Sequence, residues 1–177
     1  FINTHGLNRV ASLDQPIAGQ LKANQLRSKL PLALGIQNWS NYDPANNHAL
    51  IELEGGARLR DLNVVLDARR LGLPNMGGYD GQTFVGAMST STHGTGLSLG
   101  PFPDSVRSLV LATTGQYVGA TIGGKANPDP GVFLYRIEPS DGITDPAKYD
   151  DPEIALIQDD DVFYATIVSM GCFGVIY

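Results

Sequence analysis

The chain has 177 residues, of which 42% are hydrophobic and 17% charged, a composition typical of a folded globular domain and not of a disordered segment. Its formal net charge of −6 argues against nucleic acid or an anionic membrane as a partner, because like charges repel. No apolar run approaches the roughly 20 residues of a membrane-spanning helix, and Cys172 is the only cysteine, which excludes an internal disulfide. That single cysteine and the absence of signal-peptide features from the first residues favour the cytoplasm.

The first half of the chain contains one well-defined element. Residues 1–48 give only a helical pattern over 19–34, which Pro31 interrupts. The stretch ALIELEGG, residues 49–56, predicts a short strand that stops at its two glycines. A helix near 58–70 follows, because apolar side chains recur there at helical spacing and a glycine beyond them suits the C-terminal stop: Leu59, Leu62, Val65, Leu66 and Gly72.

The second half predicts strands and one further helix. Residues 104–122 read as two strands joined at TTGQ in an antiparallel hairpin. Residues 123–157 form a long excursion, with a strand near VFLYRIE. A helix over 160–169 begins at a cap supplied by one of three successive aspartates, and GCFGVIY, 171–177, starts a buried strand. The residues that we expect to define this helix are Asp159 to Asp161 at its start and, facing inward, Phe163, Ile167 and Met170.

The stretch VGAMSTSTHGTG, Val85 to Gly96, is rich in glycine and in short hydroxyl side chains. Glycine lets a ligand approach the backbone, and successive N–H groups form a concavity that binds anions. No lysine or arginine falls between Arg70 and Arg107, so backbone dipoles and hydroxyls would have to hold a phosphate there. The run is neither G-x-G-x-x-G nor a P-loop. Two interpretations stay open: a phosphate-binding loop, or a Ser/Thr-rich loop with glycines at its turns.

Four segments in order resemble one known family: EGGARLRDLNVVLDARRLGLPNMGG, TFVGAMSTSTHGTG, DSVRSLVLATTGQ and DDDVFYATIVSMGCFGVI. They are similar to the FAD-binding domain of the vanillyl-alcohol oxidase / p-cresol methylhydroxylase (PCMH) superfamily, within it to oxidases of sugar lactones, alditols and cholesterol. The similarity covers 49–122 and 158–177. It implies an α+β fold, with a mostly antiparallel sheet flanked by helices, that forms the second lobe of a two-lobe FAD-binding domain.

The resemblance also implies which residues line the FAD, carried over position by position. They are Thr83, Gly86, Ala87, Ser89, Thr90, Thr92, His93, Gly94 and Gly96, then Gly171, Gly174, Val175 and Ile176. Asp104 stands where the family often has an acidic residue that opens the next strand. His93 has two open roles, fixing the loop by local hydrogen bonds or acting beside the flavin. We expect the Asp159–Asp161 run to cap a helix and not to bind a metal, and Cys172 to be a small buried residue.

Two departures from the family pattern limit the prediction. The chain has no G-x-G-H-S loop, and no substrate-binding domain follows its Gly-Val-Ile strand. We therefore expect 1–177 to be a partial FAD-binding domain with possible insertions at 14–48 and 123–157. Within a longer chain it would serve an FAD-linked oxidoreductase that oxidises an alcohol carbon of a small molecule by hydride transfer to flavin, with oxygen or another acceptor taking the electrons.

Other functions remain open at this stage. No catalytic residue is named and no metal is expected, because in the family the groups that act on substrate come mostly from the missing domain. The first alternative is a non-catalytic flavin-fold module that acts in binding or as a scaffold. The second is a different phosphate-binding protein, of the transferase or kinase kind, against which the lack of a nearby lysine weighs. The sequence leaves the substrate, the flavin linkage and the oligomeric state open.

Overall fold

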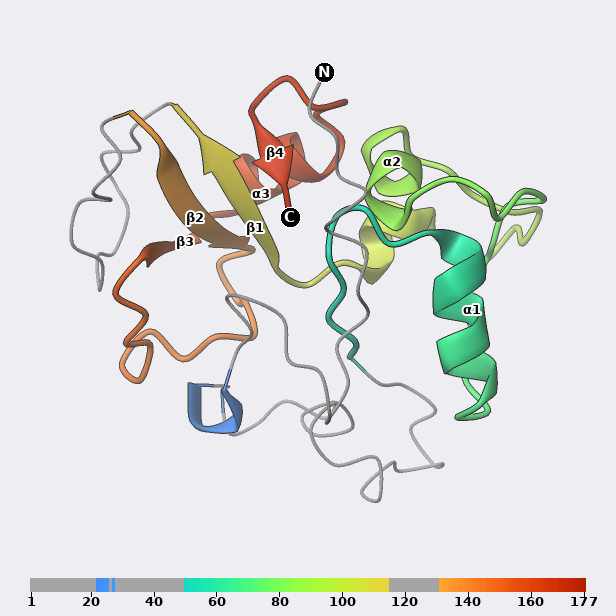
Figure 1. Cartoon of the computed structure of the whole chain (residues 1–177), viewed down its shortest axis with the longest axis horizontal. Helices are drawn as coiled ribbons and strands as arrows, with labels where there is room; N and C mark the ends of the chain where they lie inside the picture. The colour runs from blue at the N-terminus through green and yellow to red at the C-terminus, as the bar shows by residue number, and fades with distance from the viewer. Residues whose placement is uncertain (1–21, 26, 28–49, 115–130) are drawn as a thin grey trace.

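The computed structural model describes residues 22–25, 27, 50–114 and 131–177. A four-stranded sheet in the order β3-β2-β1-β4 organises them (Figure 1). β1 pairs antiparallel with β2 and with β4, whereas β2 and β3 run parallel. The sheet is therefore mixed, and the predicted α+β class is confirmed. The strands are β1 (Leu109–Thr113), β2 (Phe133–Glu138), β3 (Ile154–Gln158) and β4 (Val175–Ile176).

Two of the predicted strands form where we expected them. The strand near VFLYRIE is β2, and the first arm of the expected hairpin is β1, whose Leu111 faces Tyr135 of β2. The second arm, over 117–122, lies outside the described residues. The predicted insertion at 123–157 stays a prediction, but its described part builds β2 and most of β3.

The prediction of a strand over 49–56 is wrong. Among the described residues 50–56, only Leu53 is a bridge residue, and the chain turns at Gly55 and Gly56. A Cβ added to Gly55 would meet the backbone carbonyl of Ile176. The chain turns where Gly55 meets the end of β4, and residues 50–56 contribute no strand to the sheet that the structure describes.

Helix α1 (Leu59–Asp67) forms for the predicted reason but ends differently. Its buried residues, Leu59, Leu62 and Leu66, are the apolar stripe read from the sequence. The stop is not at Gly72. Instead Arg70 takes the left-handed conformation, with φ 57°, and the amide of Leu71 donates to the carbonyl of Leu66 at 3.0 Å. This pattern is a Schellman motif with arginine in the position that usually holds glycine.

Helix α3 (Asp160–Ile167) is capped as expected, because the carboxylate of Asp159 accepts the amide of Val162 at 3.0 Å. Phe163 and Ile167 are buried. The prediction for Met170 is wrong, since its side chain is 73% exposed. The helix has ended by then, and Met170 has a φ of 50°, so helical spacing no longer applies to it.

The remaining helical elements are short. Most of the helical pattern predicted over 19–34 falls outside the described residues. The part that is described contains a 3₁₀ turn, η2 (Ala23–Gln25). The glycine-rich stretch, expected as a loop, contains helix α2 (Phe84–Ser89), and η4 (Phe102–Ser105) follows the loop. Among the helices of the described residues, none is long and apolar enough to span a bilayer.

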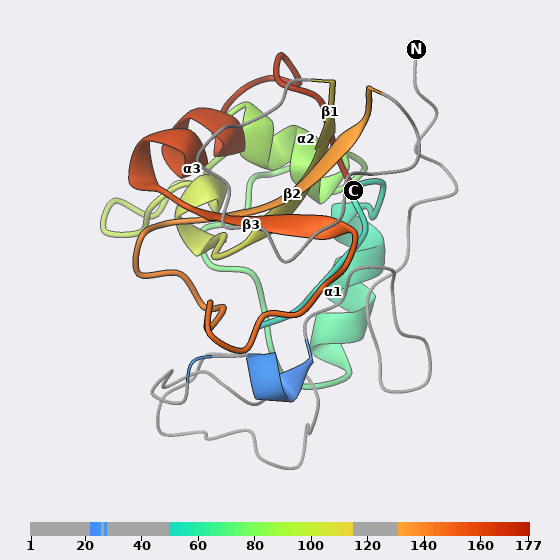
Figure 2. The same cartoon turned by 90° about the vertical axis from the view of Figure 1, so that its left-hand side faces the viewer.

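The two faces of the sheet differ in chemistry. One face is apolar: Leu109 and Leu111 of β1, with Tyr135 and Ile137 of β2, join the helices in a single core. Figure 2 shows α2 and α3 on that side of the sheet. On the other side lies the loop between β2 and β3, residues 139–153, drawn in orange (Figure 2). Both layers pack against the sheet. The first does so through apolar side chains, and on the second side buried apolar residues of the strands (Val110, Ile154 and Leu156) lie beside the buried polar groups of Arg136 and Glu138.

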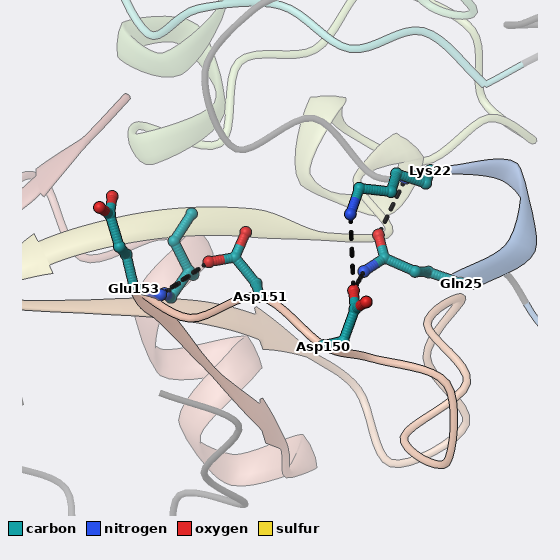
Figure 3. Close-up of polar contacts among 6 residues, drawn as sticks. Lys22, Gln25, Asp150, Asp151 and Glu153 are labelled. Carbon is teal, nitrogen blue, oxygen red and sulfur yellow. Dashed lines mark hydrogen bonds and ion pairs between the residues drawn. The ribbon is translucent and has the colours of Figure 1, made fainter. Parts of the chain in front are cut away.

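Polar contacts tie the 139–153 loop to η2 (Figure 3). The carboxylate of Asp150 accepts a hydrogen bond from Gln25 Nε2 at 2.7 Å and lies 3.6 Å from Lys22 Nζ. The Asp151 carboxylate accepts the amide of Glu153 at 2.9 Å, in a turn that leads into β3. These acidic side chains therefore have structural partners inside the chain.

Candidate functional site

The N-terminus of α2 is closed by groups of the chain itself. The hydroxyl of Thr83 accepts the amide of Gly86 at 3.1 Å. The amide of Phe84 donates to the carbonyl of Ala57 at 2.9 Å, next to a β-bridge between Arg58 and Thr83. The amides of Phe84 and Gly86 at this helix end are therefore not available to hydrogen bond to an anion. In this structure Thr83 and Gly86, two predicted cofactor residues, shape the helix that carries the loop.

The chain leaves α2 through a closed loop, residues 92–102. Ser91 has a φ of 55°, which reverses the chain. The amide of Thr92 donates to the carbonyl of Ala87 at 2.9 Å, and the carbonyl of Thr92 accepts the amide of Phe102 at 2.9 Å. Phe102 is 1% exposed and stacks on Phe84 with ring centroids 5.6 Å apart. Both ends of the 92–102 loop are thus fixed to the core.

Backbone amides on this loop are open to a ligand. Within the part of the chain that the structure describes, the N–H groups of His93, Gly94 and Thr95 donate to no other residue. His93 and Thr95 are exposed and Gly94 is partly exposed. Three successive amides without an intramolecular partner are the kind of group that binds an anionic oxygen. The loop therefore carries donors where the sequence placed an anion site.

The imidazole of His93 makes a local hydrogen bond. Its Nδ1 lies 2.8 Å from the carbonyl oxygen of Gly94. A carbonyl can only accept, so Nδ1 is the donor in this contact. This contact is the loop-fixing role that we left open for His93; a role beside a flavin stays a prediction.

The other predicted residues of the first segment divide between the core and the surface. Ala87 and Ser89 are 0% and 8% exposed, so their side chains pack inside. The Thr90 hydroxyl donates to the Gly86 carbonyl at 3.0 Å and lies 3.4 Å from the hydroxyl of Thr92. Thr90 is exposed, and its hydroxyl oxygen keeps capacity to accept a further hydrogen bond.

The second predicted segment, Gly171 to Ile176, follows α3. Val175 and Ile176 form β4 and pair with β1. Gly174 has a φ of 148°, and a Cβ there would overlap the carbonyl of Ala112, so the residue must be glycine for β4 to reach β1. Because α2 contacts α3, the two predicted segments issue from neighbouring helices.

Two further sequence predictions concern Cys172 and Asp104. The expectation of a buried cysteine is wrong: Cys172 is exposed, in the turn after α3 where its amide donates to the carbonyl of Ser169. Asp104 lies in η4, and its carboxylate sits against the backbone of Gly100 at the end of the loop. Among the described residues no group of three or more histidine, cysteine or acidic side chains could hold a metal ion.

The sequence did not identify Asn75, whose side chain makes three hydrogen bonds to the 92–102 loop. Its side-chain amide hydrogen bonds to Gly96, Leu99 and Gly100. A local signal was present, because asparagine after a proline and a helix end is a common left-handed turn residue. The partners, 21 to 25 residues away, could not be read from that signal.

Comparison with known proteins adds an independent finding. An L-gulono-1,4-lactone dehydrogenase of Mycobacterium tuberculosis is 47% identical over 69 residues, which are 39% of this chain and 16% of that protein. A putative D-arabinono-1,4-lactone oxidase of Neurospora crassa is 33% identical over 84 residues, 48% of this chain and 15% of that protein. An alditol oxidase of a Streptomyces species is 36% identical over 63 residues, 36% of this chain and 15% of that protein.

The chain is similar to one segment of the sugar-lactone and alditol oxidoreductases. This similarity confirms the resemblance predicted from the sequence motifs. The matched stretches span only about one-sixth of the length of these oxidoreductases. No family profile and no solved structure matches the chain.

Proposed function

We propose that the chain is part of an FAD-dependent oxidoreductase that oxidises a CH–OH carbon of a small sugar-derived molecule. The observation that carries the proposal is the 92–102 loop, which presents three successive free amides in the sequence THGTG. The similarity to lactone and alditol oxidoreductases supports it from an independent direction. In this proposal the described residues belong to the second lobe of a two-lobe, PCMH-type FAD-binding domain.

The amides of His93, Gly94 and Thr95 would bind the pyrophosphate of FAD. A pyrophosphate carries negative charge, and the loop has no lysine or arginine between Arg70 and Arg107 to neutralise it. Backbone dipoles and hydroxyls therefore supply the attraction. Thr90, Thr92 and Gly96 flank these residues in the chain and would complete the site. The other predicted residues, Thr83, Gly86, Ala87 and Ser89, are the cap and part of α2, which precedes the loop.

The segment after α3 would contribute the far end of the same site. The residues predicted to contact the cofactor in this segment have no long side chains: Gly171, Gly174, Val175 and Ile176. Gly171 has a φ of 80°. A backbone without bulky side chains can lie close to a planar or anionic group. We propose that this segment contacts the cofactor through main-chain atoms.

The flavin, when bound, supplies hydride acceptance from the alcohol carbon, and oxygen or another acceptor then takes the electrons. The residues described here would bind and orient the cofactor. We assign no catalytic residue to the chain. The substrate class, a sugar lactone or an alditol, is taken from the names of the similar proteins and is part of the proposal.

The test is the visible absorption spectrum of the protein produced from its intact gene, before and after acid precipitation. We expect the bands of oxidised flavin, bleached by L-gulono-1,4-lactone, D-arabinono-1,4-lactone or an alditol under anaerobic conditions. Colour that remains in the acid pellet would show covalent attachment. A colourless protein that also fails to take up added FAD would overturn the proposal, and flavin that no alcohol reduces would favour a non-catalytic module.

A further inference from the structure

The turn that precedes α2 lies against the 92–102 loop. In this turn Asn75 follows Pro74 and has a φ of 52°, the left-handed conformation that asparagine reaches more easily than most residues. The side chain of Asn75 is partly buried. The turn at residue 75 and the loop at residues 96–100 therefore meet at the side-chain amide of Asn75.

The amide of Asn75 uses both of its ends. Its Oδ1 accepts the backbone N–H of Gly96 at 2.9 Å. Its Nδ2 donates to the carbonyls of Leu99, at 2.9 Å, and of Gly100, at 3.1 Å. Only a primary amide accepts on one atom and donates twice from the other. An aspartate would keep the contact to Gly96 but would lose both donated bonds.

Close packing adds to these hydrogen bonds. A Cβ placed on Gly94 would lie 2.5 Å from the carbonyl oxygen of Met76 and 2.7 Å from Oδ1 of Asn75. Glycine is therefore required for the loop to lie on the turn. The loop is held by packing at Gly94 and by hydrogen bonds at Gly96 and at residues 99–100. The amides just before Gly96, those of residues 93–95, keep no partner among the described residues.

We infer that Asn75 is a positioning residue, which holds the amides of His93, Gly94 and Thr95 in the arrangement that receives the anionic cofactor. This inference rests on the proposed function. Asn75 acts through the loop and does not itself need to touch the cofactor. A loop arranged before binding saves the conformational entropy that a mobile loop would lose on binding.

The experiment compares Asn75→Gly with Arg70→Gly in the protein from its intact gene. Both positions have positive φ, 52° and 57°, which glycine adopts without strain, and only Asn75→Gly loses the three side-chain hydrogen bonds to the loop. We expect the dissociation constant of FAD from the apoprotein to rise about tenfold in Asn75→Gly and to stay unchanged in Arg70→Gly. Asn75→Asp should weaken binding at least as much, because its charge faces two carbonyls.

Hydrogen exchange of the 93–100 backbone, measured on the apoprotein by mass spectrometry, separates this role from a general loss of structure. We expect faster exchange there in Asn75→Gly, while exchange of β1 and β2 is unchanged. Unchanged FAD affinity in Asn75→Gly, or weaker affinity with unchanged loop exchange, would overturn the inference. If the wild-type protein binds no FAD, the proposed function itself fails, which is a different result.

Discussion

Two loops of similar length are anchored in opposite ways. The 139–153 loop lies over one face of the sheet and is anchored by Glu138, which is 0% exposed and accepts three hydrogen bonds, from the amide and hydroxyl of Thr144 and from Gln158 Nε2. The 92–102 loop is anchored by the partly buried amide of Asn75. The first loop turns its polar groups inward to one another. The second keeps successive amides free on its outer side.

The two kinds of anchoring suit two different roles, which we propose are stabilising the fold for the 139–153 loop and binding the cofactor for the 92–102 loop. A buried carboxylate whose oxygens are all satisfied fixes a loop because each lost partner leaves a group desolvated. A loop that must bind a ligand needs the opposite, donors that remain available. We therefore expect changes in the first loop to alter the free energy of unfolding and changes in the second to alter cofactor affinity.

The largest effect is expected from Glu138→Ala. This change removes the acceptor of three hydrogen bonds and leaves the amide and hydroxyl of Thr144, a fully buried residue, without that acceptor. We expect a loss of about 2–4 kcal/mol in the free energy of unfolding, measured by urea denaturation. Glu138→Gln keeps the shape and one carbonyl oxygen, so its loss should be smaller. Equal losses in both variants would show that the carboxylate itself, and not the shape of the side chain, anchors the loop.

A second prediction concerns Gly94→Ala on the 92–102 loop, which we propose to bind the cofactor. The added methyl group would lie 2.5 Å from the carbonyl of Met76, so the loop has to move off the turn. Overpacking of this kind costs about 1–3 kcal/mol, and we expect FAD affinity to fall about 10- to 100-fold with little change in the urea midpoint. The control is Gly78→Ala, because a Cβ there meets nothing within 4 Å. Equal affinity in the two variants would contradict the assignment of the loop.

The smallest effect is a pH dependence that belongs to the 139–153 loop. Burial raises the pKa of Tyr149 from 10.0 to about 12, and the nearby Arg136 guanidinium opposes this rise only in part. The folded state therefore prefers the neutral phenol. Its contribution is fully present below pH 10, where the unfolded chain is also neutral, and is lost as the pH rises toward 12.

We expect Tyr149→Phe to reduce the loss of stability between pH 10 and 12 and to leave the profile near neutrality unchanged. The measurement is urea denaturation at a series of alkaline pH values, with tyrosinate absorbance followed on the folded protein. Ionisation of Tyr149 near pH 10 in the folded wild-type protein would contradict the prediction that burial in this loop raises its pKa.

The site residues stay a prediction, but the backbone groups that could serve them can be compared with the sequence. The THGTG motif and its neighbours pointed to the right stretch of chain for free backbone donors, because glycine and hydroxyl residues act over short distances. The sequence did not show that Thr83 and Gly86 are occupied with capping α2, nor that the open amides are those of His93 to Thr95. Whether an amide is free depends on every other segment that could reach it, and Asn75 reaches the loop from 21 residues away.

The sequence by itself determined the local elements and the resemblance. The apolar spacing of α1 and the Asp159 cap of α3 are interactions among residues within one or two helical turns, so they could be read directly. Only the tertiary structure decided the mixed sheet, the exposure of Cys172, and the contact between Asn75 and the loop. Those features depend on which distant segments come together, and periodicity and capping rules carry no information about that choice.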